Sequence, residues 1–196
     1  MNLGSFLEMV QYGTSEKANS DKVGIPVLRI NNIKDGKIDI SDLKHILLEE
    51  TTLESLCLQD GDILIIRTSG SRGLVGTCAV FHKPGIYVFA SYLIRLRVSP
   101  EKADPDYIAW YINSTIGRRQ VDSLSRKIMQ NNINSQELRR LQIALPPLEI
   151  QHGIMNRVAE GRAEIDNERE VSQRLRWKTR INIEEMILGI RPVEGV

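Results

Sequence analysis

The 196-residue chain has 41% hydrophobic and 26% charged residues, the ordinary range for a globular protein, and a net charge of only +1. No apolar stretch approaches the roughly 20 residues of a membrane helix, and the first residues lack the basic start and apolar core of a secretory signal. We therefore expect a cytoplasmic protein with one domain of ordinary size and an extension. The two cysteines lie in apolar surroundings without metal-ligand spacing, which favours buried free thiols.

The near-zero total hides an uneven distribution of charge. Residues 1–60 carry a balance of −4, residues 61–147 a balance of +6, and residues 148–196 a balance of −1. A surface that faces nucleic-acid phosphates needs local positive potential rather than a basic total. The middle of the chain meets that requirement, although an ordinary charged surface would have the same composition.

The part of the chain before Pro146-Pro147 predicts a mixed, strand-rich α+β domain. Apolar patterns bounded by turn signals predict strands at 23–33, 37–40, 63–66, 74–81, 86–98 and 141–145. The first two are separated by an Asp-Gly dipeptide, which is a hairpin signal.

Two segments of this domain have a helical pattern. Apolar residues recur at helical spacing over 106–116, and Asp104-Pro105 supplies a cap and a first-turn proline. A short helix at 135–140 is expected to be capped by Asn134 or Ser135. We place the domain boundaries at 1–146 and 147–196.

After the double proline, a helix is predicted from Leu148 to about Lys178, about 45 Å long. It carries an interrupted apolar stripe of Ile150, Ile154, Val158, Ile165 and Leu175. Such a rod is too long to bury itself on a small domain, so the stripe favours coiled-coil-like pairing with a partner helix. The alternative is an ordinary amphipathic helix that packs on its own domain. Residues 181–190 could form a second helix that folds back, or a docking surface.

Three polar groups are candidates for nucleic-acid contact. The first follows strand 63–66 in a loop with three glycines, which permit tight turns and a close approach to a ligand: Thr68, Ser69, Ser71 and Arg72. The second combines phosphate-neutralising cations with an amide that can read adenine: Arg118, Arg119, Arg126, Lys127 and Gln130. The third and weakest ends the first strand: Arg29, Asn31 and Asn32.

Each group also has a structural interpretation. The glycine-rich loop could be a plain turn, since it lacks the GK[ST] of a nucleotide-binding loop. The second group could be a solvated helix end, and for Asn132 and Asn134 we prefer helix capping to base contact. The third group could fix the Asp-Gly turn that follows it.

No enzyme signature is present in the sequence. The histidines His45, His82 and His152 are scattered and suggest neither a triad nor a metal site, and no glycine-rich cofactor loop follows a first strand. We therefore expect a binding protein without a catalytic residue, a metal or a cofactor of its own.

Taken together, these pieces resemble the specificity subunits of type I restriction-modification enzymes. The matching segments are GIPVLRINNIKDGKI, LQDGDILIIRTSGSRGLVG, PDYIAWYINSTIGRRQV and KIMQNNINSQELRRLQIALPPLEIQ, followed by the long helix. The resemblance implies a target recognition domain that binds double-stranded DNA. It also implies a spacer helix that docks methyltransferase subunits, with motor-nuclease subunits as further partners. S-adenosylmethionine, ATP and Mg are then expected only on those partners.

This chain departs from the family pattern because it has one recognition domain and one helix where typical members have two of each. We expect a homodimer through residues 148–180 that reads a bipartite target. Two alternatives are a dimeric scaffold that binds only protein and the recognition domain of a fused DNA methyltransferase. Met1 directly before the domain argues against the fusion.

Overall fold

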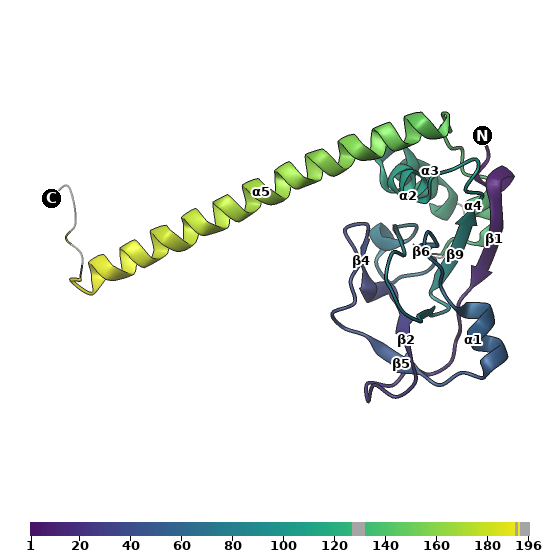
Figure 1. Ribbon diagram of the computed structural model, residues 1–196, viewed down its shortest axis with the longest axis horizontal. Coiled ribbons are helices and arrows are strands. Elements are labelled where there is room, and N and C mark those ends of the chain that lie inside the picture. The colour runs from purple at the N-terminus through teal and green to yellow at the C-terminus, as the bar shows by residue number, and fades with distance from the viewer. Residues whose placement is uncertain (127–131, 191, 193–196) are drawn as a thin grey trace. The chain divides into compact units, whose positions relative to one another are not determined.

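The computed structural model describes residues 1–126, 132–190 and 192 and divides the chain into two compact units, 1–152 and 153–196. The first unit holds the strands and the short helices, and the second consists mainly of one long helix, α5 (Leu148–Ile187), whose first turn belongs to the first unit (Figure 1). Within the described ranges, no helix is long and apolar enough to cross a membrane.

A four-stranded antiparallel sheet forms the middle of the first unit. Its order is β1 (Leu7–Tyr12), β9 (Leu93–Val98), β6 (Ile63–Ile66) and β7 (Cys78–Val80). The predicted apolar run Ile63–Ile66 is confirmed as a strand, and all four of its side chains are buried. Because successive side chains of a strand point to opposite faces, burial of all four means that both faces of β6 are covered, which explains a continuous apolar run instead of an alternating one.

A smaller sheet and a hairpin complete the strands. The sheet has the order β5 (Lys44–Ile46), β2 (Ile25–Leu28) and β8 (Val88–Phe89). The hairpin joins β3 (Ile33–Lys34) to β4 (Lys37–Ile38) through Asp35 and Gly36, whose φ angles of 51° and 72° suit a type I′ turn. The strand predicted at 23–33 is therefore interrupted, by a 3₁₀ turn at Ile30–Asn32.

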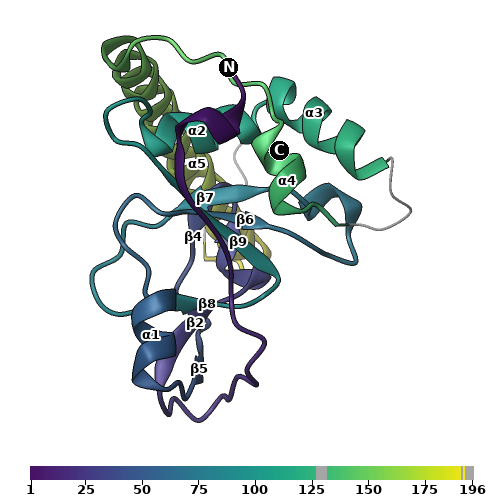
Figure 2. The same cartoon turned by 90° about the vertical axis from the view of Figure 1, so that its right-hand side faces the viewer.

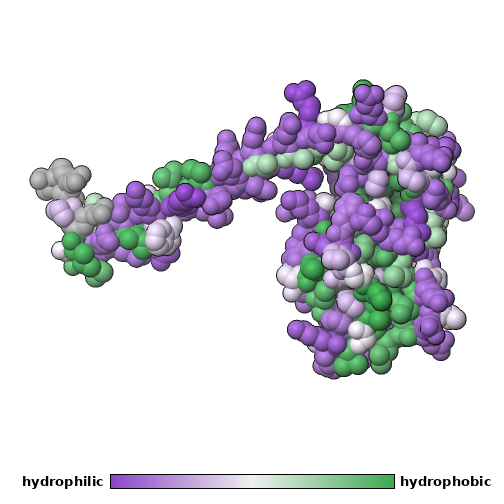
Figure 3. Space-filling model, viewed as in Figure 1, coloured by the Kyte–Doolittle hydropathy of each residue, from purple (hydrophilic) through white to green (hydrophobic). Residues whose placement is uncertain are grey.

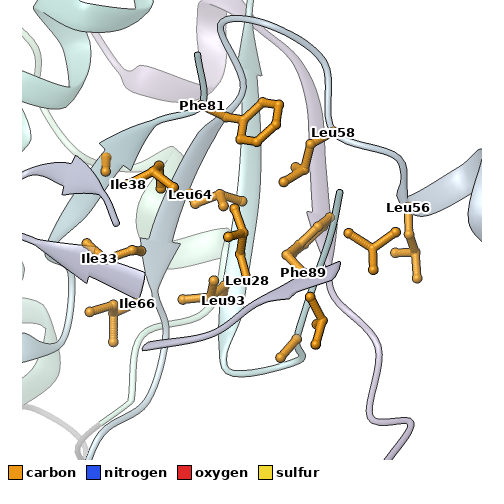
Figure 4. Close-up of a cluster of buried hydrophobic side chains, with 14 of the residues drawn as sticks. Leu28, Ile33, Ile38, Leu56, Leu58, Leu64, Ile66, Phe81, Phe89 and Leu93 are labelled. Carbon is orange, nitrogen blue, oxygen red and sulfur yellow. The ribbon is translucent and has the colours of Figure 1, made fainter. Parts of the chain in front are cut away.

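The main hydrophobic core lies where the two sheets and α1 (Glu50–Leu56) come together. Figure 4 shows Leu28 and Phe89 of the smaller sheet beside Leu64, Ile66 and Leu93 of the larger one. Both cysteines are free thiols; Cys78 is buried, as predicted, whereas Cys57 is half-buried. Burial raises the pKa of the Cys78 thiol to about 12, so this thiol is chemically inert near neutral pH.

Asp62, at the start of β6, is fully buried and pairs with two arginines of β9. Its carboxylate accepts hydrogen bonds from Arg97 Nε at 2.8 Å and Nη2 at 2.9 Å, and Arg95 Nη1 lies 3.4 Å away. Arg95 also donates to the carbonyls of Ser55 and Cys57, at 2.8 and 2.7 Å. These bonds tie α1 to the sheet.

Among the described residues of the first unit, the helices α2 (Pro105–Asn113) and α4 (Ser135–Arg139) were predicted, whereas α1 and α3 (Thr115–Arg126) were not. Asp104 caps α2 by accepting a hydrogen bond from Tyr107 N, and Asn134 caps α4 in a capping box. Figures 1 and 2 show α2, α3 and α4 at one end of the unit and the β5-β2-β8 sheet at the other. The start of α3 was missed although Ser114 precedes it, and Ser114 Oγ accepts a hydrogen bond from Gly117 N at 3.3 Å.

A histidine links the first turn of α2 to the turn before β6. His82 Nδ1 lies 2.8 Å from Asp60, and Nε2 lies 3.0 Å from Asp106. Burial disfavours the charged imidazolium, but the bonds to the two carboxylates outweigh burial and raise the pKa of His82.

The strand predicted at 141–145 is wrong. Leu141 and Ile143 are buried, but the segment forms only an isolated bridge, between Asn2 and Gln142. Its bonds go to the beginning of the chain: Leu3 N donates to Leu141 O and Ile143 N donates to Met1 O, both at 2.8 Å. The alternating apolar pattern thus marks alternating burial without a sheet ladder.

The long helix α5 begins where the double proline predicts and extends beyond the predicted end, to Ile187. Its first turn is anchored by Gln151, which is completely buried. Gln151 Oε1 accepts from Asp104 N at 2.9 Å, and Nε2 donates to the carbonyls of Lys102 and Pro146. The segment 181–187 continues this helix, which excludes a second helix that folds back there. The predicted fold class, a strand-rich α+β domain followed by a long C-terminal helix, is confirmed.

Candidate nucleic-acid interface

The glycine-rich loop between β6 and β7 is a compact hydrogen-bonded turn. Gly76 N donates to Ile66 O at 2.8 Å, and Thr77 N donates to Leu74 O at 3.0 Å. Gly76 has a φ of +79°, and a Cβ at this position would lie 2.4 Å from Cγ1 of Val121 in α3. The glycine is therefore required for the loop to approach α3 closely.

The hydroxyl residues of the predicted first group lie along this loop. Thr68 and Ser69 are half-buried, Ser71 is exposed, and Ser69 Oγ accepts a hydrogen bond from Ser71 N. Arg72 begins a 3₁₀ turn, and its side chain is outside the described part of the structure. The loop thus presents an exposed serine, Ser71, at the surface.

Arg118 of α3 donates hydrogen bonds to the backbone of the glycine-rich loop. Its Nη1 donates to Val75 O at 2.8 Å, and its Nη2 donates to Gly73 O at 3.0 Å. A third contact, from Nη1 to Thr77 Oγ1, is 3.5 Å long. These bonds give Arg118 a structural role in addition to the DNA contact that was predicted. Its neighbour Arg119 is exposed.

The structure brings the first and second predicted groups together. Thr68 forms an antiparallel bridge with Asn132, and Ile133 N donates to Arg67 O at 2.9 Å. Residues separated by more than 60 positions in the sequence therefore share one edge of the domain. Lys127 and Gln130 of the second group are outside the described residues. Arg126 ends α3, and its side chain is likewise not described.

A cleft of about 320 Å³ is lined both by residues of the third group and by a residue of the glycine-rich loop. Its lining consists of Ile30, Asn31, Asn32, Ile33, Lys34, Asp39, Asp42 and Leu74, the last of which belongs to the glycine-rich loop. Asn31 is exposed, whereas Asn32 is buried and donates to the carbonyls of Asp39 and Asp42. Asn32 thus fixes the chain around the Asp-Gly turn, as the structural interpretation of this group predicted.

The cations beside this cleft already have carboxylate partners. Arg29 lies 3.4 Å from Asp42, and Lys34 forms a short ion pair with Asp39. Hydrogen bonds from Lys34 and from Ser41 hold the pKa of Asp39 well below its usual value, so the pair stays ionised near neutral pH. The third group therefore adds little free positive charge to the surface.

Sequence reasoning missed an arginine–tyrosine pair in this region. The guanidinium carbon of Arg67 lies 4.9 Å from the ring centroid of Tyr12, at the end of β1. No signal in the sequence could have joined two residues so far apart. In the described parts of the chain, no cluster of three or more His, Cys, Asp or Glu side chains could hold a metal ion.

The second unit carries a separate candidate interface. One face of α5 has an apolar groove of about 770 Å³, lined by Asn167, Glu168, Val171, Ser172, Leu175, Arg176, Thr179, Arg180, Ile183 and Glu184. Figure 3 shows hydrophobic patches on an otherwise hydrophilic helix. Of the predicted dimerisation residues, Ile150, Ile165 and Leu175 are 51%, 50% and 59% exposed, while Ile154 and Val158 are half-buried.

Comparison with known proteins identifies the family. The family model of the type I restriction modification DNA specificity domain matches residues 1–175. The chain belongs to this family. The resemblance that its motifs indicated is thereby confirmed.

Specificity subunits of two type I restriction enzymes are similar in sequence to this chain. The specificity subunit of the type I restriction enzyme EcoKI from Escherichia coli (strain K12) is 31% identical over 163 residues, which cover 82% of this chain and 35% of that subunit. The StySPI specificity subunit from Salmonella potsdam is 31% identical over 184 residues, 92% of this chain and 39% of that subunit. The chain therefore spans little more than a third of the length of these relatives.

Solved structures share the fold of this specificity domain. A chain solved to explain complex assembly and conformational transition of the type I R-M system matches all of this chain and 50% of its own length, with a TM-score of 0.64 and 20% identity. The HsdS subunit from Thermoanaerobacter tengcongensis matches 84% of this chain and 37% of its own length, with a TM-score of 0.56 and 17% identity. At these identities the likeness concerns the fold alone.

Proposed function

We propose that this specificity domain is the sequence-specific DNA recognition component of a type I restriction-modification system. The observation that carries the proposal is the bridge between Thr68 and Asn132, which joins two candidate DNA-contact segments at one edge of a specificity-domain fold. The positive excess of residues 61–147 supports it, because nucleic-acid binding needs local positive potential.

In the proposed mechanism the domain binds and positions DNA, and catalysis belongs to partner subunits. Arg119, Arg126 and Lys127 contact phosphates and fix the register, and Ser71 and Gln130 face base edges. A methyltransferase partner would then flip an adenine from the duplex and methylate it with S-adenosylmethionine. ATP and Mg would be used by motor-nuclease subunits.

A bipartite target requires two recognition domains. We propose that a second copy of this chain supplies the other one through the apolar stripe of α5. A two-fold axis makes the two interfaces identical, so the dimer would read inverted copies of one half-site.

The DNA-binding proposal is tested by measuring affinity for duplex DNA over a range of salt concentrations, with the target taken from methylation mapping of the host genome. Each phosphate contact contributes about one unit to the salt slope, so the double variant Arg126→Ala with Lys127→Ala should reduce the slope by about two. The matched control, Lys17→Ala with Lys37→Ala, removes two exposed lysines from the acidic part of the chain and should leave the slope unchanged. A wild-type chain that binds no DNA at low salt, alone or with a methyltransferase subunit, would refute the function.

The dimer is tested by sedimentation of Ile154→Asp with Val158→Asp. Burial of a Val or Ile side chain contributes about 1.5–3 kcal/mol, and each substitution occurs in both chains. Even half of that value predicts a rise in the dissociation constant of about two orders of magnitude or more. The control Asn156→Asp with Gln173→Asp places the same charges on exposed positions away from the stripe and should remain dimeric. Dimers that persist in the Ile154–Val158 variant would exclude the stripe as the interface. A dimer that forms normally but never binds DNA would instead favour a protein-binding scaffold.

A further inference from the structure

Arg67 occupies the junction between three segments of the candidate interface. It directly follows β6, and its backbone N–H donates to Tyr92 O in the turn before β9, at 2.8 Å. Its carbonyl accepts from Ile133 N at 2.9 Å. Because both backbone groups are bonded, the position of Arg67 is fixed by the β8–β9 turn on one side and by the 132–134 segment on the other.

The side chain of Arg67 is oriented by an aromatic ring. The guanidinium lies over Tyr12, 4.9 Å from the ring centroid, and the Tyr12 hydroxyl in turn accepts a hydrogen bond from Ser135 N at 3.1 Å. Tyr12 is 38% exposed, so the stack lies at the surface of the domain. A planar guanidinium on a ring loses less side-chain freedom when it later binds a ligand.

The side chain of Arg67, unlike its backbone, makes no hydrogen bond within the described part of the protein. Its Nε is buried without a partner, and none of the ion pairs among the described residues involves Arg67. By contrast, Arg29, Arg95, Arg97 and Arg118 all donate to carbonyls or carboxylates. A partly buried cation without a counter-charge has a free-energy cost, unless a ligand supplies the missing hydrogen-bond acceptors.

Thr68, the next residue along the chain, pairs with a residue that also has a polar side-chain atom without a hydrogen-bond partner. Thr68 bridges to Asn132, and Asn132 Oδ1 is also buried without a hydrogen-bond partner. An unused donor and an unused acceptor thus lie on adjoining strands of backbone, beside Ser69 and Ser71. Both of these atoms are buried and cannot themselves reach a ligand. The terminal nitrogens of Arg67 also have no hydrogen-bond partner among the described residues, but they are not buried, so they are the donors that suit the acceptors on the edge of a base pair.

We propose that Arg67 reads a guanine in each half-site of the target, with both terminal nitrogens directed at O6 and N7 of the base. This inference rests on the proposed DNA-binding function and adds a specificity-determining residue to it. A guanidinium held in one plane matches the two coplanar acceptors of guanine, and Arg with guanine is the commonest specific contact in the major groove. A phosphate contact needs only a mobile charge and would gain nothing from the Tyr12 ring.

The decisive experiment compares the base preferences of variants on a library of duplexes randomised across the mapped target. Arg67→Lys retains the charge but lacks the planar fork. It should lose the preference for one G·C pair per half-site by on the order of 10- to 100-fold, and keep its preferences elsewhere. The salt slope should stay within the error of the wild-type slope. Tyr12→Leu should weaken the preference at the same position, and Tyr12→Phe, which retains the ring, should preserve it.

Three results would overturn the inference. Uniform weakening across all sequences, with a salt slope reduced by about one in Arg67→Ala, would make Arg67 a phosphate contact. Unchanged preferences in Arg67→Lys, in a protein whose wild type does discriminate among sequences, would refute base reading and leave the proposed function standing. A wild type that shows no preference for any sequence would refute both.

Discussion

The variant Arg118→Ala tests whether Arg118 supports the glycine-rich loop or contacts DNA. Arg118 was predicted to bind DNA, yet its guanidinium faces the carbonyls of Val75 and Gly73. Removal of the side chain beyond Cβ deletes both bonds and leaves the two carbonyls to water. The loop should then open more readily while the rest of the domain stays folded.

The size of the effect follows from the geometry of the bonds. Two of the three contacts have good lengths, 2.8 and 3.0 Å, and a hydrogen bond from a charged donor contributes about 1.5–3 kcal/mol when it is shielded from water. The Arg118 side chain is 21% exposed, so values near the lower end apply. Against this loss, the alanine variant no longer has the entropy cost of ordering the arginine side chain on folding, up to about 2 kcal/mol. We expect a net loss of about 1–2 kcal/mol, concentrated in the loop.

Amide hydrogen exchange measures this local loss directly. Exchange at Gly76 and Thr77, whose N–H groups are bonded inside the loop, should accelerate by about 5- to 30-fold. DNA affinity should fall without a change in salt slope, since the charge of Arg118 is directed at carbonyls. The matched variant Arg119→Ala removes the exposed neighbour and should lower the slope by about one without faster exchange. If Arg118→Ala lowers the slope and leaves exchange unchanged, Arg118 contacts phosphate and the structural role is wrong.

Three further predictions concern the stability of the first unit. His82 has a raised pKa, so its protonated form stabilises the fold below about pH 6.5, and this contribution disappears as the pH rises through the folded-state pKa. The difference in unfolding free energy between wild type and His82→Gln, measured in urea, should therefore shrink from pH 5.5 to pH 8. An equal difference at both pH values would contradict the bridge to Asp60 and Asp106. Gly76→Ala should cost about 1–3 kcal/mol, because the new methyl group would overlap Val121 and the positive φ is strained, whereas Gly70→Ala, with open space around it, should cost less than about 1 kcal/mol in thermal unfolding. Asp62→Asn should cost about 3–5 kcal/mol in denaturant unfolding, since it leaves the buried guanidinium beside it uncompensated; a loss below about 1 kcal/mol would show that the pair is dispensable.

The sequence predicted correctly those elements that depend on neighbouring residues, such as helix caps and turn residues. The helix after Asp104-Pro105 has its cap and first-turn proline in place, and the hairpin at Asp35-Gly36 has the backbone that its turn residues favour. The 141–145 segment failed because alternation reports which side chains are buried and not which backbone groups pair. The one bridge that this segment forms with the described residues joins it to Asn2, far away in sequence.

The candidate interface likewise has parts that local sequence signals predicted and contacts that only the tertiary structure reveals. Composition and glycine spacing located the 67–76 loop and the 118–134 segment, because these are local signals. The bond from Arg118 to Val75 and the stack of Arg67 on Tyr12 join residues more than 40 positions apart, and a single sequence contains no measure of such contacts. Whether a polar side chain faces a ligand or another part of the protein is therefore decided by tertiary structure.

The contacts between Met1–Leu3 and Leu141–Ile143 have a consequence for how this recognition module can be exchanged. The Met1 ammonium donates to Ile143 O at 2.7 Å, so the polypeptide enters and leaves the globular part at neighbouring points. A module built this way can be excised from one gene and spliced into another with short seams, and the flanking segments need not move to accept it. With the proposed recognition function, an exchange at these two points would replace the whole DNA-reading surface in a single event.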